Sequence, residues 1–125
     1  WQGLTSEEVA DGWPLERDAL RRGVDLRRGG DGESMADVLA RVAEGLEEAL
    51  DALAPGGCLV LSTHGGSGRA AVSWLLGIDL ELAWRVLGGL GNCHWAELRE
   101  GEAGWRLQTW NASSAEGSRD GSSPP

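Results

Sequence analysis

The sequence has 125 residues, and 41% hydrophobic content with seven tryptophans supplies enough apolar material for one folded domain. A formal net charge of −9 opposes binding to nucleic acid or to an anionic membrane, and no run approaches the roughly 18 apolar residues of a membrane helix. Because no basic segment followed by an apolar one opens the sequence, we expect a cytoplasmic protein without a membrane partner.

The first predicted element is a short helix that begins at about Ser6 and continues until Pro14. Thr5 and Glu8 stand three residues apart, as in a capping box. A weak helix and a loop follow, in a stretch with three more arginines than aspartates: Arg17, Arg21, Arg22, Arg27 and Arg28 against Asp18 and Asp25. This basic patch either faces a small anionic substrate and tunes its binding, or is a solvated helix face paired with nearby acids.

The most clearly patterned helix is predicted from about Met35 to Ala54. Ser34 and Asp37 supply its capping signal, and apolar residues recur at three- and four-residue steps. A Pro-Gly-Gly sequence ends this helix. The next segment, Cys58–Leu61, is apolar on both alternating faces, which is typical of a buried, parallel strand covered by helices on each side.

A second long helix is expected to begin near Arg69, to contain Trp74 and to end at Gly77. A shorter helical segment over residues 80–87 gives way to a glycine-rich turn. Two last strands should pair as a hairpin, over residues 93–99 and 104–111.

These elements predict an α/β domain, with a mixed sheet flanked by helices, over residues 1–111. Residues 112–125 are small, polar and aperiodic, and we expect a disordered tail there. Cys58 and Cys93 stand beside apolar neighbours and form no C-x-x-C pair, so we expect buried free thiols, with no metal site.

A histidine stands where the predicted strand gives way to glycines and then to a helix. Ligands bind outside the carboxyl ends of strands in open α/β sheets, where a helix N-terminus offers unpaired N–H groups and a positive dipole end. Gly65 and Gly66 allow an anion to approach these groups, and His64 can donate a hydrogen bond to a phosphoryl oxygen or exchange a proton. The layout favours a phosphate site. His94 lies in a predicted strand, without a glycine turn or acidic neighbour, and is interpreted as structural.

Two competing motifs overlap this site. Gly65-Gly66-Ser67-Gly68 approaches the nucleophile elbow of serine hydrolases, but Arg69 occupies the position of the last glycine, whose small size lets the sharp turn pack. The segment also lacks the Lys-Ser/Thr pair of a P-loop. Both alternatives are therefore disfavoured.

Four ordered segments resemble the second half of the histidine phosphatase superfamily, branch one, which is phosphoglycerate mutase-like: Trp1-Gln2-Gly3-Leu4, Gly32-Glu33-Ser34, Thr63-His64-Gly65-Gly66 and Gly91-Asn92. The resemblance covers nearly all of residues 1–111. The Gly-Asn-x-x-Trp and Trp-Arg-Leu-x-x-Trp-Asn segments near its end are most similar to glucosyl-3-phosphoglycerate phosphatases. The resemblance implies a phosphoglycerate mutase-like fold whose N-terminal half is missing from this sequence.

The resemblance also implies a mechanism. In the family, a histidine of an Arg-His-Gly motif takes the phosphoryl group, arginines clamp it, and an acidic residue protonates the leaving oxygen before water hydrolyses the phosphohistidine. This sequence has no Arg-His-Gly motif. The family's second histidine matches His64, which would be catalytic by stabilising the phosphoryl group. The implied substrate-binding residues are Gly65, Gly66, Glu33, Ser34 and Asn92, and no cofactor is implied.

The function implied in this way is a phosphatase acting on a small phosphorylated metabolite, such as a phosphoglycerate or a sugar phosphate. The sequence as given should be inactive alone, because in-line phosphoryl transfer needs a positioned nucleophile. Two alternatives stay open: a mutase-type phosphotransferase, and a non-catalytic phosphate- or partner-binding module. The oligomeric state, including a homo-oligomer, is open as well.

Overall fold

The computed structural model describes residues 1 and 3–114. In this part of the chain, five helices and one two-stranded antiparallel sheet confirm the α/β class. The elements are α1 (Ser6–Gly12), α2 (Pro14–Arg21), α3 (Met35–Asp51), α4 (Gly65–Leu76), α5 (Leu80–Val86), β1 (Trp95–Gly101) and β2 (Gly104–Ala112). None of the helices described here has the length and apolar character needed to cross a membrane.

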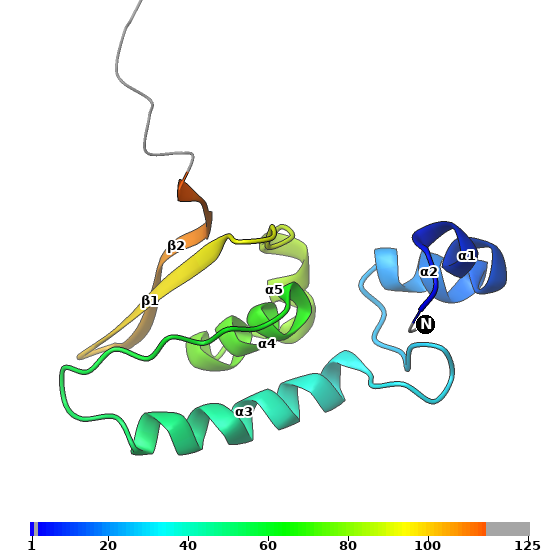
Figure 1. Cartoon of the computed structure of the whole chain (residues 1–125). Helices are drawn as coiled ribbons and strands as arrows, with labels where there is room; N and C mark the ends of the chain where they lie inside the picture. The colour runs from blue at the N-terminus through cyan, green and yellow to red at the C-terminus, as the bar shows by residue number, and fades with distance from the viewer. Residues whose placement is uncertain (2, 115–125) are drawn as a thin grey trace, which may run out of the picture.

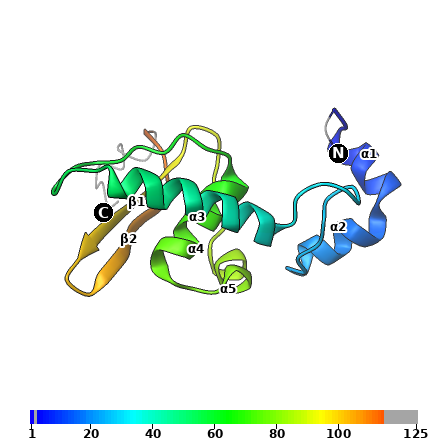
Figure 2. The same ribbon diagram turned by 90° about the horizontal axis from the view of Figure 1, so that it is seen from below.

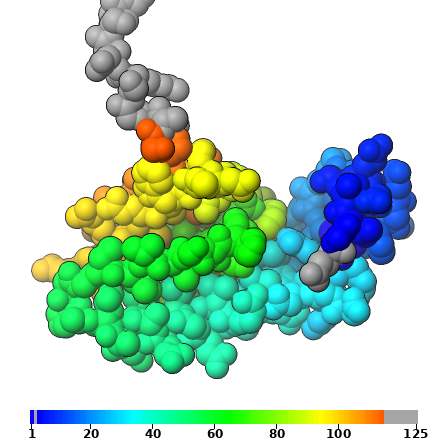
Figure 3. Space-filling model, viewed as in Figure 1, coloured from blue at the N-terminus to red at the C-terminus, as the bar shows by residue number. Residues whose placement is uncertain are grey.

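The first two helices form a small unit beyond the N-terminal end of α3, away from the hairpin (Figures 1 and 2). α1 carries the predicted capping box, in which Thr5 and Glu8 satisfy each other's backbone N–H groups. Pro14 begins α2, where its missing N–H costs nothing. The rings of Trp1 and Trp13 lie 6.0 Å apart and join the chain start to the helix junction. Figure 3 shows this unit as a lobe beside the first residues of α3.

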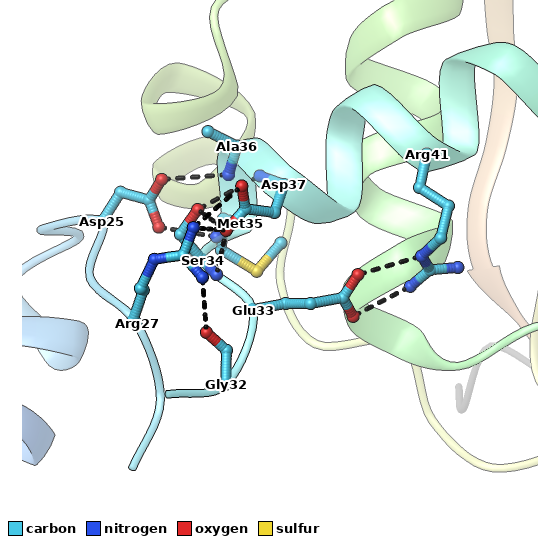
Figure 4. A network of polar contacts seen from close by, with 9 residues as sticks. All are labelled: Asp25, Arg27, Gly32, Glu33, Ser34, Met35, Ala36, Asp37 and Arg41. Atoms are coloured by element: carbon cyan, nitrogen blue, oxygen red, sulfur yellow. Dashed lines mark hydrogen bonds and ion pairs between the residues drawn. The ribbon is translucent and has the colours of Figure 1, made fainter. Parts of the chain in front are cut away.

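The N-terminus of α3 is capped twice. The predicted capping box is present, because the Ser34 hydroxyl accepts from the Asp37 N–H at 3.1 Å and Asp37 accepts from the Ser34 N–H at 3.0 Å. The Asp25 carboxylate accepts from the N–H groups of Met35 and Ala36, at 2.6 and 2.9 Å (Figure 4). These bonds satisfy the donors that a helix start leaves unpaired, and they tie the loop before α3 to the helix.

The core lies around α4, which has α3 on one side and α5 with the hairpin on the other (Figure 1). Small residues on α4 allow its neighbours to pack closely, and the Ser73 hydroxyl, 1% exposed, donates to the Ile78 carbonyl at 2.8 Å. Gly77 ends α4 in the left-handed conformation, at φ 61°, as predicted. The buried apolar residues are Met35, Leu46, Ala70, Ala71, Val72, Ala83 and Leu87.

The predicted hairpin is confirmed, with both strands ending slightly later than expected. β1 and β2 pair antiparallel, and Leu98 faces Leu107 across the ladder. Both leucines pack against the core together with Trp110. The register shifts between Trp95 and Leu98, so the first residues of β1 are irregular.

The segment Cys58–Leu61 was expected to be a buried central strand, and that prediction is wrong. It is an extended stretch that leads from α3 to α4 (Figure 1), and it pairs with no strand of the described residues. Val60 is 86% exposed and Leu61 50% exposed. Extended backbone becomes a strand only when neighbours complete the hydrogen-bond ladder, and the described sheet consists of the hairpin alone.

The expected burial of the two thiols is wrong as well. Cys58 is exposed because its segment has no covering layer, and Cys93 is exposed in the turn that precedes β1, with a positive φ of 60°. Ala112, the first residue of the predicted tail, still belongs to β2, so the strand extends one residue beyond the predicted domain boundary. Residues 115–125, which make up most of that tail, lie outside the described residues.

Candidate functional site

His64 is the N-cap residue of α4, with an extended backbone at φ −91° and ψ 155°. The helix begins at Gly65, four residues before the predicted start, and its first turn closes when the Gly68 N–H donates to the His64 carbonyl at 2.8 Å. The predicted order of extended segment, histidine and helix with Trp74 is therefore present, although the segment is not a paired strand. The side chain of His64 is exposed and makes no capping bond with the described backbone.

The first turn of α4 leaves its donors available. The N–H groups of Gly65, Gly66 and Ser67 precede the first residue that can bond back along the helix. No acidic side chain of the described chain lies in that turn. These N–H groups and the helix dipole provide a position where an anion is stabilised beside His64.

The three glycines of this turn have different surroundings. A Cβ at Gly65 would lie 3.3 Å from the Leu90 carbonyl oxygen, and one at Gly68 would lie 3.4 Å from the Leu90 side chain. Gly66 has open space at the same position. The absence of a side chain at Gly65 and Gly68 therefore allows the loop before β1 to pack on α4, whereas Gly66 leaves the outer side free for a ligand.

An open hollow of about 700 Å³ lies beside His64. One wall comes from the extended segment and the first turn of α4, and the other comes from α3. The lining residues are Arg41, Val42, Gly45, Leu46, Leu61, Ser62, Thr63, His64 and Ser67. The hollow thus brings an imidazole, three hydroxyls and a guanidinium to one surface.

Arg41 is the charged residue of this hollow that sequence reasoning missed. Its Nε and Nη2 atoms bind the two carboxylate oxygens of Glu33 at 2.9 and 3.1 Å (Figure 4). The hydrogen bond from Arg41 lowers the pKa of the Glu33 carboxyl, and the carboxylate raises the pKa of Arg41. Glu33, which is predicted to bind substrate, pairs with this cation and does not itself line the hollow. The eight-residue spacing of this pair carries no recognisable sequence signal.

None of the five predicted substrate-binding residues is among the residues that line the hollow. Gly65 and Gly66 directly follow His64, whereas Ser34 and Asn92 lie elsewhere. The hydroxyl and N–H of Ser34 are used in capping α3, which lowers the pKa of Asp37 through the hydrogen bonds of Ser34. Asn92 is exposed in the turn before β1. The structure thus brings His64, Gly65 and Gly66 together and leaves Ser34 and Asn92 apart from them.

His94 lies in that turn and not in the predicted strand, and Gly91 makes the turn possible. A Cβ at Gly91 would lie 3.0 Å from the His94 ring. The Nδ1 atom lies 2.8 Å from Oδ1 and 3.1 Å from the backbone oxygen of Asn111. Since Oδ1 also accepts from the Gly91 N–H at 2.8 Å, Nδ1 carries the hydrogen. These contacts are those of a structural histidine.

The basic patch of the arginine-rich stretch is partly neutralised. Arg22 pairs with Asp18 at 3.0 Å and Arg27 with Asp37 at 3.1 Å. None of the five arginines lines the hollow beside His64. Within residues 1 and 3–114, no three His, Cys, Asp or Glu side chains gather closely enough to hold a metal ion.

The chain belongs to the histidine phosphatase superfamily, branch 1, whose family model matches residues 1–113. Its curated relatives are glucosyl-3-phosphoglycerate phosphatases. The one from Mycolicibacterium vanbaalenii is 38% identical over 90% of this chain and 57% of its own length. The one from Mycobacterium tuberculosis is 36% identical over 90% of this chain and 56% of its own length. The chain therefore spans just over half the length of these relatives.

Solved structures agree with this assignment. The native structure of a mycobacterial glucosyl-3-phosphoglycerate phosphatase superposes with a TM-score of 0.76 at 35% identity, covering 91% of this chain and 60% of that one. Its complex with inorganic phosphate gives 0.72 at 34% identity, covering 90% and 58%. The resemblance to the superfamily, and to its glucosyl-3-phosphoglycerate phosphatases, is confirmed.

Proposed function

We propose that this chain forms one side of the active site of a phosphatase that hydrolyses a small phosphate monoester through a phosphohistidine. The observation that carries the proposal is the position of His64 at the start of α4, where it lines an open hollow and precedes three N–H groups that have no partner within the helix. A phosphoryl group seated there would receive hydrogen bonds from the amides of Gly65 and Gly66 and from the imidazole. Negative charge that builds on its oxygens in the transition state would be stabilised by these donors.

The nucleophile of this reaction is a second histidine, supplied by the part of the family fold that this chain does not span. The sequence contains two histidines, and His94 is committed to Asn111 through Nδ1. In the proposed reaction, the nucleophile forms an N–P bond as the ester P–O bond breaks, and the departing alcohol takes a proton from an acid. Water then attacks phosphorus, the N–P bond breaks and inorganic phosphate leaves. The chain alone performs neither step, because His64 has no in-line partner.

The substrate is proposed to be a phosphorylated metabolite with further polar or anionic groups. The relatives are named for glucosyl-3-phosphoglycerate, and a phosphate-bound structure exists for one of them. Arg41 places a guanidinium in the hollow of His64, where an additional negative group on the substrate would compete with the Glu33 carboxylate for its donors. We propose residues 1–111 as the portion that joins the catalytic domain, in a cytoplasmic enzyme.

A chimera tests the proposal. The part of the Mycolicibacterium vanbaalenii enzyme that this chain does not span is joined to the chain, and phosphate release is measured from glucosyl-3-phosphoglycerate, 3-phosphoglycerate and a sugar phosphate. Release that disappears when His64 or the histidine of the donor's Arg-His-Gly motif is replaced by alanine supports the proposal. Transfer of phosphate to a second position would instead identify a mutase. Phosphate binding without turnover, in a chimera that folds, would favour a binding module.

A further inference from the structure

A buried cation lies under the first turn of α4. Arg69 is 8% exposed, and its guanidinium carbon lies 4.0 Å from the centre of the Trp84 ring on α5. Burial lowers its pKa by desolvation. No ion pair is formed by this side chain in the described structure, and its Nε atom has no hydrogen-bond partner there. A buried guanidinium without a carboxylate is costly, so its remaining contacts must explain its position.

The main polar contact of Arg69 is with the loop before β1. Its Nη2 atom donates to the Gly88 carbonyl at 2.9 Å. The Nε1 atom of Trp110, on β2, donates to the same oxygen at 3.2 Å. One carbonyl is thus held from two directions by donors on α4 and β2, directly after the buried Leu87.

The far end of the same loop is fixed too, because the Gly91 N–H donates to Asn111 at 2.8 Å. Between the two anchored glycines lies Leu90, whose atoms approach the Cβ positions of Gly65 and Gly68 to 3.3 and 3.4 Å. The loop 88–91 is therefore clamped at each end, and its middle residue presses on the first turn of α4.

We propose that Arg69 is a positioning residue for the phosphate site. It fixes the Gly88 carbonyl, and through Leu90 it holds the first turn of α4, and with it His64 and the amides beside it, in place. The inference rests on the proposed function, because it concerns the precision of the same site. Hydrogen-bond donors stabilise developing charge in a transition state best when their geometry is already set. This requirement explains why a buried arginine stands at this position.

The test uses the 125-residue chain with Arg69→Met, which keeps the volume and removes the donors, and Arg69→Lys, which restores a charge and a donor without the planar stacking. Exposed Arg85, on α5, gives the matched control Arg85→Met. Amide order parameters are measured by NMR relaxation over residues 88–91 and 65–67. In Arg69→Met, we expect the order parameters of both segments to fall from about 0.85 toward about 0.6. Partial recovery in Arg69→Lys and no change in Arg85→Met complete the expected pattern.

Loosening of residues 88–91 while residues 65–67 keep their order would overturn the inference. Should Arg69→Met fail to fold, Trp110→Phe removes the second donor to the same carbonyl, and both segments should again loosen together. Unchanged order parameters in both segments would also refute the positioning role of Arg69. Titration of the chimera with inorganic phosphate separates the two proposals: if no first-turn amide shifts in the unsubstituted chimera, the proposed function fails, while the relaxation data still decide the role of Arg69. If phosphate binds, Arg69→Met should weaken it at least about tenfold, and unchanged affinity would contradict the inference.

Discussion

Replacing His64 with alanine should separate catalysis from stability. In the chimera, we expect kcat to fall by about 10² to 10⁴, the range for losing an acid–base group or a transition-state hydrogen bond. This corresponds to about 2.7–5.5 kcal/mol of activation free energy. The free energy of unfolding should change by less than about 0.5 kcal/mol, because the exposed side chain makes no capping bond with the described backbone.

His94→Ala is the matched control. This half-buried side chain bonds Asn111 through Nδ1 and lies against Gly91, so its removal loses a hydrogen bond and leaves a gap in the turn. We expect a loss of about 1–2 kcal/mol of stability, with nearly unchanged turnover of the folded fraction.

Thermal unfolding and steady-state phosphate release, measured on the same preparations, check both expectations. If His94 controlled turnover and His64 controlled only stability, the helix-terminus argument would be refuted. A loss in both quantities for His64→Ala would show that this side chain packs against the rest of the complete site.

Three further predictions concern the residues around the site. Arg41→Ala in the chimera should raise KM more than it lowers kcat, and Glu33→Gln should show a weaker change in the same direction. If Arg41→Ala mainly lowered kcat, Arg41 would instead contact the transition state. Acid should destabilise the chain below pH 3.8, the usual carboxyl pKa, because the pKa of Asp37 is lowered in the folded state. The stability that ionised Asp37 contributes is present above pH 3.8 and is lost as pH falls through the lowered pKa of the folded state. In Asp37→Asn, the decrease of the unfolding midpoint with falling pH should be smaller than in the unsubstituted chain. Leu46→Ala, at a side chain 4% exposed between α3 and α4, should cost about 2–3 kcal/mol in urea unfolding, and a loss below about 1 kcal/mol would show that this interface is loosely packed.

Features that depend on local chemistry were predictable. The capping boxes at Thr5 and Ser34, the left-handed Gly77 and the hairpin all follow from residues close in sequence, and each is present. α4 begins four residues earlier than predicted, because glycines have low helix propensity and their run favours a loop at that position. Glycine is tolerated there because Leu90 packs against that turn, a contact between distant residues that propensity does not contain.

The parts that could not be predicted are those set by distant contacts. The apolar pattern of Cys58–Leu61 indicates burial, but burial requires covering elements that the described residues do not supply. The pairing of Arg41 with Glu33 and the stacking of Arg69 on Trp84 likewise arise from how helices and loops meet in space. A local sequence pattern was enough to single out His64. The charged side chains near it could be identified only from the folded structure.

The two long helices differ in whether their N-termini are already filled, and this difference determines where a free anion can settle. α3 presents its first amides to Asp25 and Asp37, carboxylates that are covalently tethered and therefore at a high effective concentration. A dissolved phosphate would have to displace both. α4 has no such internal competitor in its first turn within the described chain. One helix end thus binds carboxylates of the chain itself, whereas the other has no such carboxylate in its first turn within the described residues. Under the proposed function, this difference favours His64 as the place where a phosphate ester binds, despite a net charge of −9.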